Sequence, residues 1–139
     1  MARLPHPDRR TVIEIIALTG IAAWCALTSA AYLVPSGEGI SQLSLAGTLI
    51  DLRAWGVAWA VVAVTVAIGI WSRPMRIIGL ALFVGMNMVW AASFMESWVM
   101  GDSGRAWVTA KNYGLIATLG MCVAAWAGGG GGCRDADLR

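Results

Sequence analysis

Four long apolar stretches without a charged residue dominate this chain, at residues 15–37, 54–72, 77–95 and 112–132. A helix needs about 20 mostly apolar residues to cross the hydrocarbon core of a bilayer, and each stretch is close to that length. The sequence therefore predicts an all-α membrane protein, with four transmembrane helices packed as an antiparallel bundle.

The composition agrees with a membrane protein. Hydrophobic residues make up 58% of the chain and charged residues only 13%, whereas soluble domains carry about 25% charged residues. We divide the 139 residues into a basic N-terminal segment (1–10), a four-span membrane domain (11–127) and a tail (128–139) that begins with five consecutive glycines. Glycine disfavours a fixed conformation, so the tail is predicted to be flexible.

The distribution of basic residues predicts the orientation in the membrane. Seven of the ten Lys and Arg residues fall on one side of the predicted spans: Arg3, Arg9, Arg10, Arg73, Arg76, Arg134 and Arg139. Loops rich in Lys and Arg stay in the cytoplasm, so both termini are predicted to be cytoplasmic. These residues are not gathered on one helical face, and no nucleic-acid partner is expected.

Tryptophan and arginine residues mark the predicted ends of the spans. Indole rings favour the headgroup region of a bilayer, and arginine favours its polar surface. We interpret the following residues as interface anchors: Arg53, Trp55, Trp71, Trp98, Arg105, Trp107 and Trp126. Trp24, Trp59 and Trp90 lie deeper and are predicted to be packing residues.

Three ionisable residues fall in or beside the spans, where a charge is costly and usually has a function or a partner. Glu14 is shallow, and Arg73 or Arg76 could reach it; an interface salt bridge is favoured over a proton- or cation-binding carboxylate. Glu96 and Lys111 are equally distant from the point between Ser103 and Gly104 in the glycine turn at 101–104. We expect them to face each other as a clip between two helices, with the lining of a polar vestibule as the alternative.

Three uncharged polar residues complete the predicted site. Asn87 lies near the centre of the third stretch, where an amide finds no water and usually forms a hydrogen bond across a helix interface. Asn112 and Tyr113 follow Lys111 and form a second polar group near the opposite surface. Pore lining is the alternative role for these residues.

The sequence gives no indication of catalysis. It contains three cysteines and one histidine without metal-ligand spacing, and neither a nucleophile with its base nor a phosphate-binding glycine loop is present. We therefore expect no enzyme activity, no metal and no cofactor.

Two short motifs resemble a known group of proteins. Arg73-Pro74-Met75-Arg76 before the third stretch, and Trp107 through Lys111-Asn112-Tyr113 before the fourth, look like those of small four-span proteins of actinobacterial phages, which are encoded near lysis genes and called holins. The resemblance implies a protein of the bacterial cytoplasmic membrane that forms homo-oligomers and permeabilises the host membrane during lysis.

Two other functions remain open. Glu14-Ile15-Ile16 is similar to the carboxylate-bearing first span of small multidrug resistance transporters, which implies proton-coupled transport. The third possibility is a membrane interaction protein, such as an immunity factor or a subunit of a larger assembly, with a membrane protein as its partner.

Overall fold

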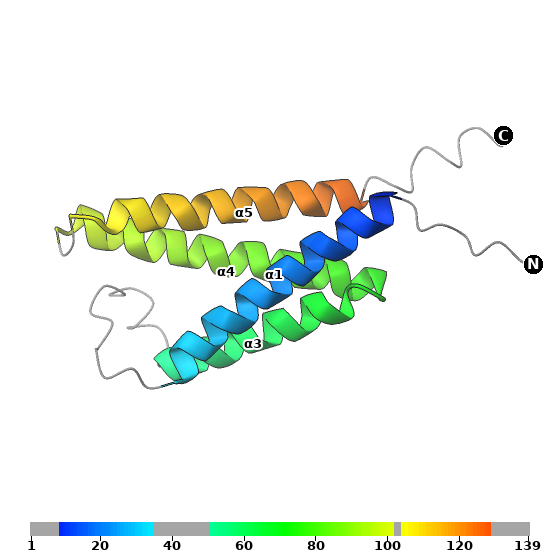
Figure 1. Cartoon of the computed structure of the whole chain (residues 1–139). Coiled ribbons are helices and arrows are strands. Elements are labelled where there is room, and N and C mark those ends of the chain that lie inside the picture. Colours follow the sequence, from blue (N-terminus) through cyan, green and yellow to red (C-terminus); the bar gives the residue numbers. More distant parts are fainter. Residues whose placement is uncertain (1–8, 35–50, 102–103, 129–139) are drawn as a thin grey trace, which may run out of the picture.

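The computed structural model describes residues 9–34, 51–101 and 104–128, and these form four helices. They are α1 (Arg9–Leu33), α3 (Leu52–Ile68), α4 (Arg73–Val99) and α5 (Ala106–Gly128) (Figure 1). No strand occurs within these ranges. The all-helical part of the prediction is confirmed. Residues 1–8 of the basic segment and the tail beyond Gly128 lie outside the described residues.

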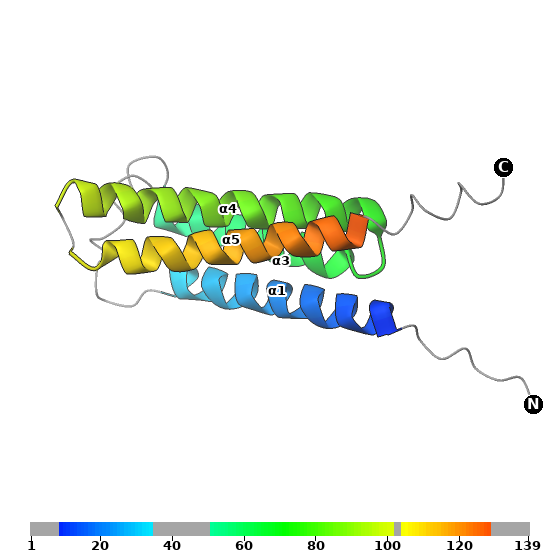
Figure 2. The same ribbon diagram turned by 90° about the horizontal axis from the view of Figure 1, so that it is seen from above.

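The helices form two antiparallel pairs that join through α3 and α4. Helix α1 packs along α3, and α4 packs along α5, whereas α1 and α5 barely touch. Arg9, the α3–α4 turn and Gly128 lie at one end of the bundle, which we call the terminal end (Figures 1 and 2). The opposite end, with Leu33, Asp51 and the α4–α5 turn, is the loop end.

Proline and glycine, and not charged residues, mark where α3 and α4 begin or end. Helix α3 ends at Ile68 and is capped by Gly69, whose N–H donates to the Thr65 carbonyl at 3.0 Å. Pro74 lies in the first turn of α4, where its missing N–H costs nothing. Gly101 follows α4 with a φ of 83°, which glycine adopts without strain. The helices consequently begin earlier than the charge-free stretches, because a charged side chain does not end a helix.

Two of the described helices are long and apolar enough to cross a membrane: Thr11–Leu33 within α1, with a mean hydropathy of 1.8, and α4, with 1.9. Helix α3 is apolar but has only 17 residues, and α5 contains Lys111 and Asn112 near its start. A signal sequence or the core helix of a soluble protein can be equally long and apolar. However, only 11% of the α1 segment and 39% of the α4 segment is buried inside the bundle, so neither is enclosed like a core helix.

The core consists of two groups of buried side chains. The larger group joins α1, α3 and α4 and contains Leu18, Cys25, Trp59, Val62, Ala63, Val66, Leu80 and Phe83. The second group lies toward the loop end, joins α3, α4 and α5, and contains Trp55, Trp90, Phe94, Ala106 and Ala110. The small residues of α5 in this group bring its backbone close to the aromatic rings of α4.

Gly79 permits the close crossing of α3 and α4. A Cβ atom placed on Gly79 would lie 2.9 Å from the backbone nitrogen of Val66, which is shorter than a van der Waals contact. The two helices could accept a larger residue only by moving apart.

We expect Gly79→Ala to lower the free energy of unfolding by about 1–3 kcal/mol, because the added methyl group overpacks this crossing. Gly85→Ala is the matched control on the same helix, since a Cβ there meets nothing within 4 Å and alanine gains up to about 1 kcal/mol in helix propensity. The measurement is denaturant unfolding in mixed micelles, followed by circular dichroism. Equal effects of the two substitutions would contradict the proposed close crossing.

Candidate functional site

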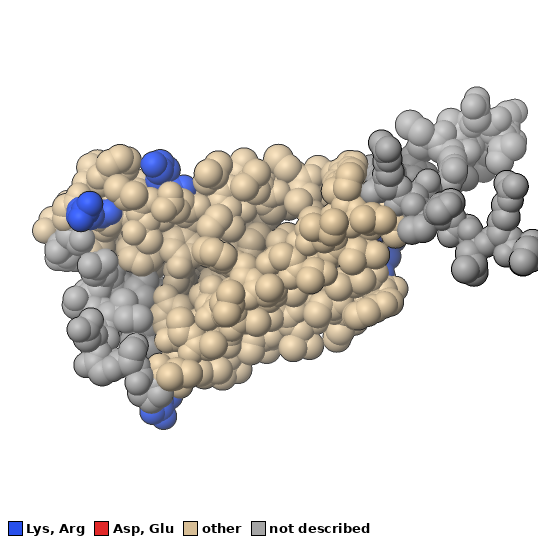
Figure 3. Space-filling view, in the orientation of Figure 1, with Lys and Arg blue, Asp and Glu red and all other residues tan. Residues whose placement is uncertain are grey.

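The outer surface of the bundle is largely apolar. Large apolar side chains are exposed on all four helices, among them Ile16, Leu27, Val61, Val64, Ile77, Ile78, Met88, Leu115 and Leu119. On the face shown in Figure 3, Lys and Arg lie only near the two ends, and no Asp or Glu is visible. Soluble monomers rarely expose contiguous apolar patches of more than a few hundred Å². This surface is suited to hydrocarbon.

An ion pair between Glu14 and Arg76 connects α1 to the first turn of α4. Arg76 also donates through Nε to the Gly69 carbonyl at 2.9 Å and through Nη2 to the Ile70 carbonyl at 3.3 Å. Both charged side chains are 19% exposed. Of the two arginines predicted to reach Glu14, the structure pairs it with Arg76. The guanidinium therefore compensates the carboxylate charge and satisfies carbonyls that the end of α3 leaves open.

The predicted clip between Glu96 and Lys111 is wrong, because no ion pair joins these two described residues. The ammonium of Lys111 lies instead 5.5 Å from the ring centre of Trp107, one turn earlier on α5, as a cation–π contact. Ser97 and Ala110 are the buried residues at this level of α4 and α5. Glu96 directly precedes Ser97, and Lys111 directly follows Ala110. One residue along a helix is a rotation of about 100°, so both charged side chains are turned away from the interface.

Asn87 does not connect two helices, contrary to the prediction. Its side chain is fully buried, and Nδ2 donates to the Phe83 carbonyl of the same helix at 2.8 Å. Within the described part of the chain, Oδ1 has no hydrogen-bond partner. A side chain near the backbone of its own helix can bond to the preceding turn, and this local bond replaces the expected interhelical one.

Two further hydrogen bonds between described residues join helices. Ser29 of α1 donates to the Gly56 carbonyl of α3 at 2.8 Å, and the Trp90 indole of α4 donates to the Tyr32 hydroxyl of α1 at 3.0 Å. Sequence reasoning missed both contacts. Serine and tyrosine are common in apolar helices, and nothing in their spacing shows which face meets a neighbour.

An aromatic cluster surrounds Trp90 toward the loop end. The ring of Trp90 lies 4.6 Å from that of Trp55, 5.8 Å from Tyr32 and 6.2 Å from Trp59, all in edge-to-face geometry. Trp55, predicted as an interface anchor, is therefore buried. Trp59 and Trp90 are buried as predicted, whereas Trp24, the third predicted packing residue, is exposed.

The other predicted anchors are on the surface. The exposed ones are Arg53, Trp71, Trp98, Arg105, Trp107 and Trp126, all near helix ends. The predicted polar group at the start of α5 is divided between two environments. Tyr113 stacks on Phe94 with a ring distance of 5.8 Å, whereas Asn112 is exposed.

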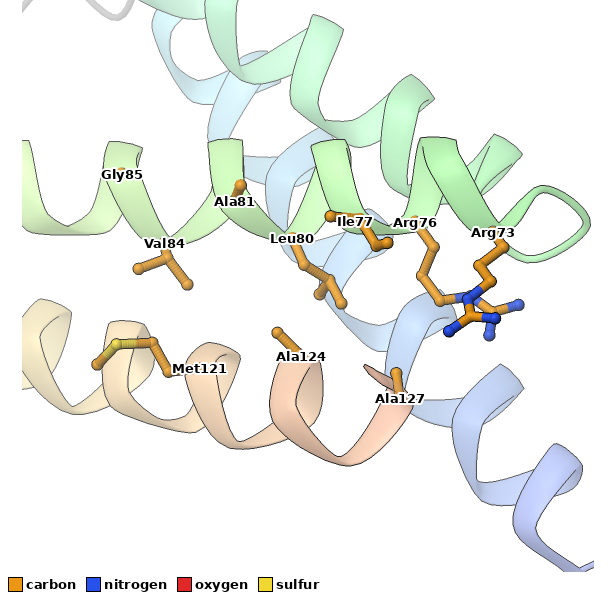
Figure 4. A pocket seen from close by; sticks show the side chains of 10 residues that line it. All are labelled: Arg73, Arg76, Ile77, Leu80, Ala81, Val84, Gly85, Met121, Ala124 and Ala127. Atoms are coloured by element: carbon orange, nitrogen blue, oxygen red, sulfur yellow. The ribbon is translucent and has the colours of Figure 1, made fainter. Parts of the chain in front are cut away.

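Grooves interrupt the apolar surface, and two of them are lined almost entirely by apolar groups. One, of about 440 Å³, lies between α4 and α5 at the terminal end, with Arg73 and Arg76 at its mouth (Figure 4). The second, of about 370 Å³, lies between α1 and α5 and is lined by apolar residues that include Ile16, Gly20 and Leu119. The second groove exists because α1 and α5 do not close the bundle.

Within the described residues, no group of three or more His, Cys, Asp or Glu side chains could hold a metal ion, and Cys25 and Cys122 are free thiols. Comparisons with protein-family models, with curated proteins and with solved structures find no match for this chain. The fold and the polar groups define a helical bundle with an apolar exterior.

Proposed function

We propose that this chain is a four-span membrane protein with holin-like activity, whose copies associate in the cytoplasmic membrane of a bacterial host and permeabilise it. The observation that carries the membrane location is the apolar exterior of all four helices. In water, exposing this surface would cost about 25 cal/mol for each Å², whereas lipid tails remove that cost.

Helices α3 and α5, which are shorter or less apolar than α1 and α4, also fit a bilayer. Helix α3, with 17 residues, is about 25 Å long at 1.5 Å per residue and stands at the lower limit for a span. Arg53 and Trp71 flank it at the two ends. In α5, Lys111 is one turn from the start of the helix and exposed, so its ammonium can extend to the membrane surface.

The closed interior supports action by association. Arg76 compensates Glu14, Asn87 is sealed among packed side chains, and the pockets between helices are lined mainly by apolar groups. These two grooves of a single protomer thus offer a cation few polar partners. Permeabilisation requires several copies, and the open side between α1 and α5 gives them a surface on which to meet.

The alternatives are weaker on the same observations. A proton-coupled transporter needs an accessible carboxylate, and Glu14 is held by an arginine. An interaction or assembly protein would share the apolar exterior and would differ in having no effect on the membrane by itself.

The first test is insertion and orientation. In a cysteine-free background, Gly104→Cys at the loop end should react from outside the cell with an impermeant thiol reagent, and Ser72→Cys at the terminal end should react only after the membrane is opened. The protein should also stay in the membrane pellet after carbonate extraction. Release by carbonate, or labelling of Ser72→Cys alone from outside, would contradict the four-span arrangement.

The second test is permeabilisation. Induced expression in a bacterial host is expected to collapse the membrane potential, measured with a potential-sensitive dye, and to reduce viability. Gly79→Leu should abolish the effect, because it separates α3 from α4, while Gly114→Leu, where a Cβ meets nothing within 4 Å, should retain it. An unchanged potential at equal membrane abundance would refute holin-like activity; drug efflux that depends on Glu14 would then identify a transporter.

A further inference from the structure

We propose that the groove between α4 and α5 binds an anionic phospholipid, with one acyl chain in the groove and the phosphate at Arg73. The inference rests on the proposed membrane insertion and concerns the lipid that the inserted protein selects. The site would lie at the terminal end, which is the predicted cytoplasmic surface.

The groove has the shape and lining of an acyl-chain site. Ile77, Leu80 and Val84 line it from α4, and Met121, Ala124 and Ala127 line it from α5 (Figure 4). Alanines on α5 and Gly85 on α4 leave the space of about 440 Å³ open. Apart from the two arginines, none of the described residues that line it is charged.

The length of the groove matches one leaflet. It extends along α4 from Arg73 to Gly85, which is about 18 Å at 1.5 Å per residue. Half of the hydrocarbon core is about 15 Å thick. A lipid with its phosphate level with Arg73 would thus place its acyl chain beside Leu80 and Val84 and end near the bilayer centre.

The charge at the mouth favours an anion. Arg76 is already paired with Glu14, but the guanidinium of Arg73, which is exposed, has no ion pair or hydrogen bond with another described residue. Both side chains lie at the same end of the groove (Figure 4). Arginine presents a planar donor fork that fits a phosphate, and basic pockets between membrane helices on the cytoplasmic side bind anionic headgroups. An apolar peptide or a second copy of the chain would not need this free charge.

The test is native mass spectrometry of the full chain in mild detergent, titrated with phosphatidylglycerol and phosphatidylcholine that carry the same acyl chains. We expect phosphatidylglycerol to bind about fivefold better, the value of one arginine near an anionic headgroup. Arg73→Gln should remove the preference and Arg73→Lys should keep it. Arg53→Gln, an exposed arginine at the loop end, is the matched control and should bind like the parent.

Two further experiments distinguish the contribution of the acyl chain from that of the phosphate. Gly85→Phe should weaken binding of both lipids by filling the groove, and it should fold normally because a Cβ at Gly85 meets nothing within 4 Å. Excess inorganic phosphate should not displace the lipid; displacement would reveal a simple phosphate site and overturn the proposal. Equal binding of the two lipids, or equal losses in Arg73→Gln and Arg53→Gln, would also overturn it. If carbonate extracts the protein from membranes, the proposed function and this inference both fail; if the protein stays inserted without a lipid preference, this inference alone fails.

Discussion

Trp90→Ala is expected to lower the free energy of unfolding by about 3–5 kcal/mol, the usual cost of removing a buried indole. Trp90 is fully buried and contacts Trp55, Trp59 and Tyr32. Its removal leaves a cavity where α1, α3 and α4 meet. Detergent cannot fill a sealed cavity, so the lost dispersion contacts are not replaced. Unfolding in mixed micelles, followed by circular dichroism and tryptophan fluorescence, measures the loss.

Trp71→Ala is the matched control for the indole. Trp71 is 83% exposed at the α3–α4 turn, so its removal should change the unfolding free energy by no more than about 0.5 kcal/mol. Trp90→Phe should fall between the two, because it keeps a ring but removes the donor to Tyr32. Similar losses in Trp90→Ala and Trp71→Ala would show that the aromatic cluster is not a packed core.

Arg76→Met is expected to lower the free energy of unfolding by about 2–4 kcal/mol, near the range for breaking a buried ion pair. The substitution leaves Glu14 without its cation and leaves the Gly69 and Ile70 carbonyls without their donor. Both side chains are 19% exposed, so water can partly hydrate the unpaired carboxylate. We therefore expect a smaller loss than for a fully buried pair. The same micelle unfolding assay provides the measurement.

A second variant separates the ion pair from the two carbonyl bonds. Glu14→Gln combined with Arg76→Met removes the uncompensated carboxylate and should recover about half of the loss. Arg73→Met is the matched control, because Arg73 has no ion pair within the described ranges, and it should be close to neutral in detergent. Simple additivity of Glu14→Gln and Arg76→Met would show that the two side chains do not interact in solution.

Position along the bundle axis followed from the sequence. Each residue of a helix advances 1.5 Å, so apolar length, glycine turns and charge spacing predict the level of a side chain along the axis without knowledge of its neighbours. The pairing of Glu14 with an arginine in the first turn of α4 was predictable for this reason. A long arginine side chain near a turn can reach in several directions. An ion pair can therefore be predicted from two opposite charges at the same level, without knowing how each helix is rotated.

Rotation about each helix axis was decided only by the tertiary structure. Glu96 and Lys111 flank the buried Ser97 and Ala110 instead of facing each other, and Trp55 turns inward to Trp90 although its position suits an interface anchor. Asn87 is buried but bonds to its own helix. A nearly uniform apolar helix has no polar face to orient it, so its rotation depends on which small and large side chains interlock. The sequence by itself determined the four helices. Packing at Gly56, Gly79 and Gly120 decided which residues meet, because close contact depends on three-dimensional shape that a linear pattern does not contain.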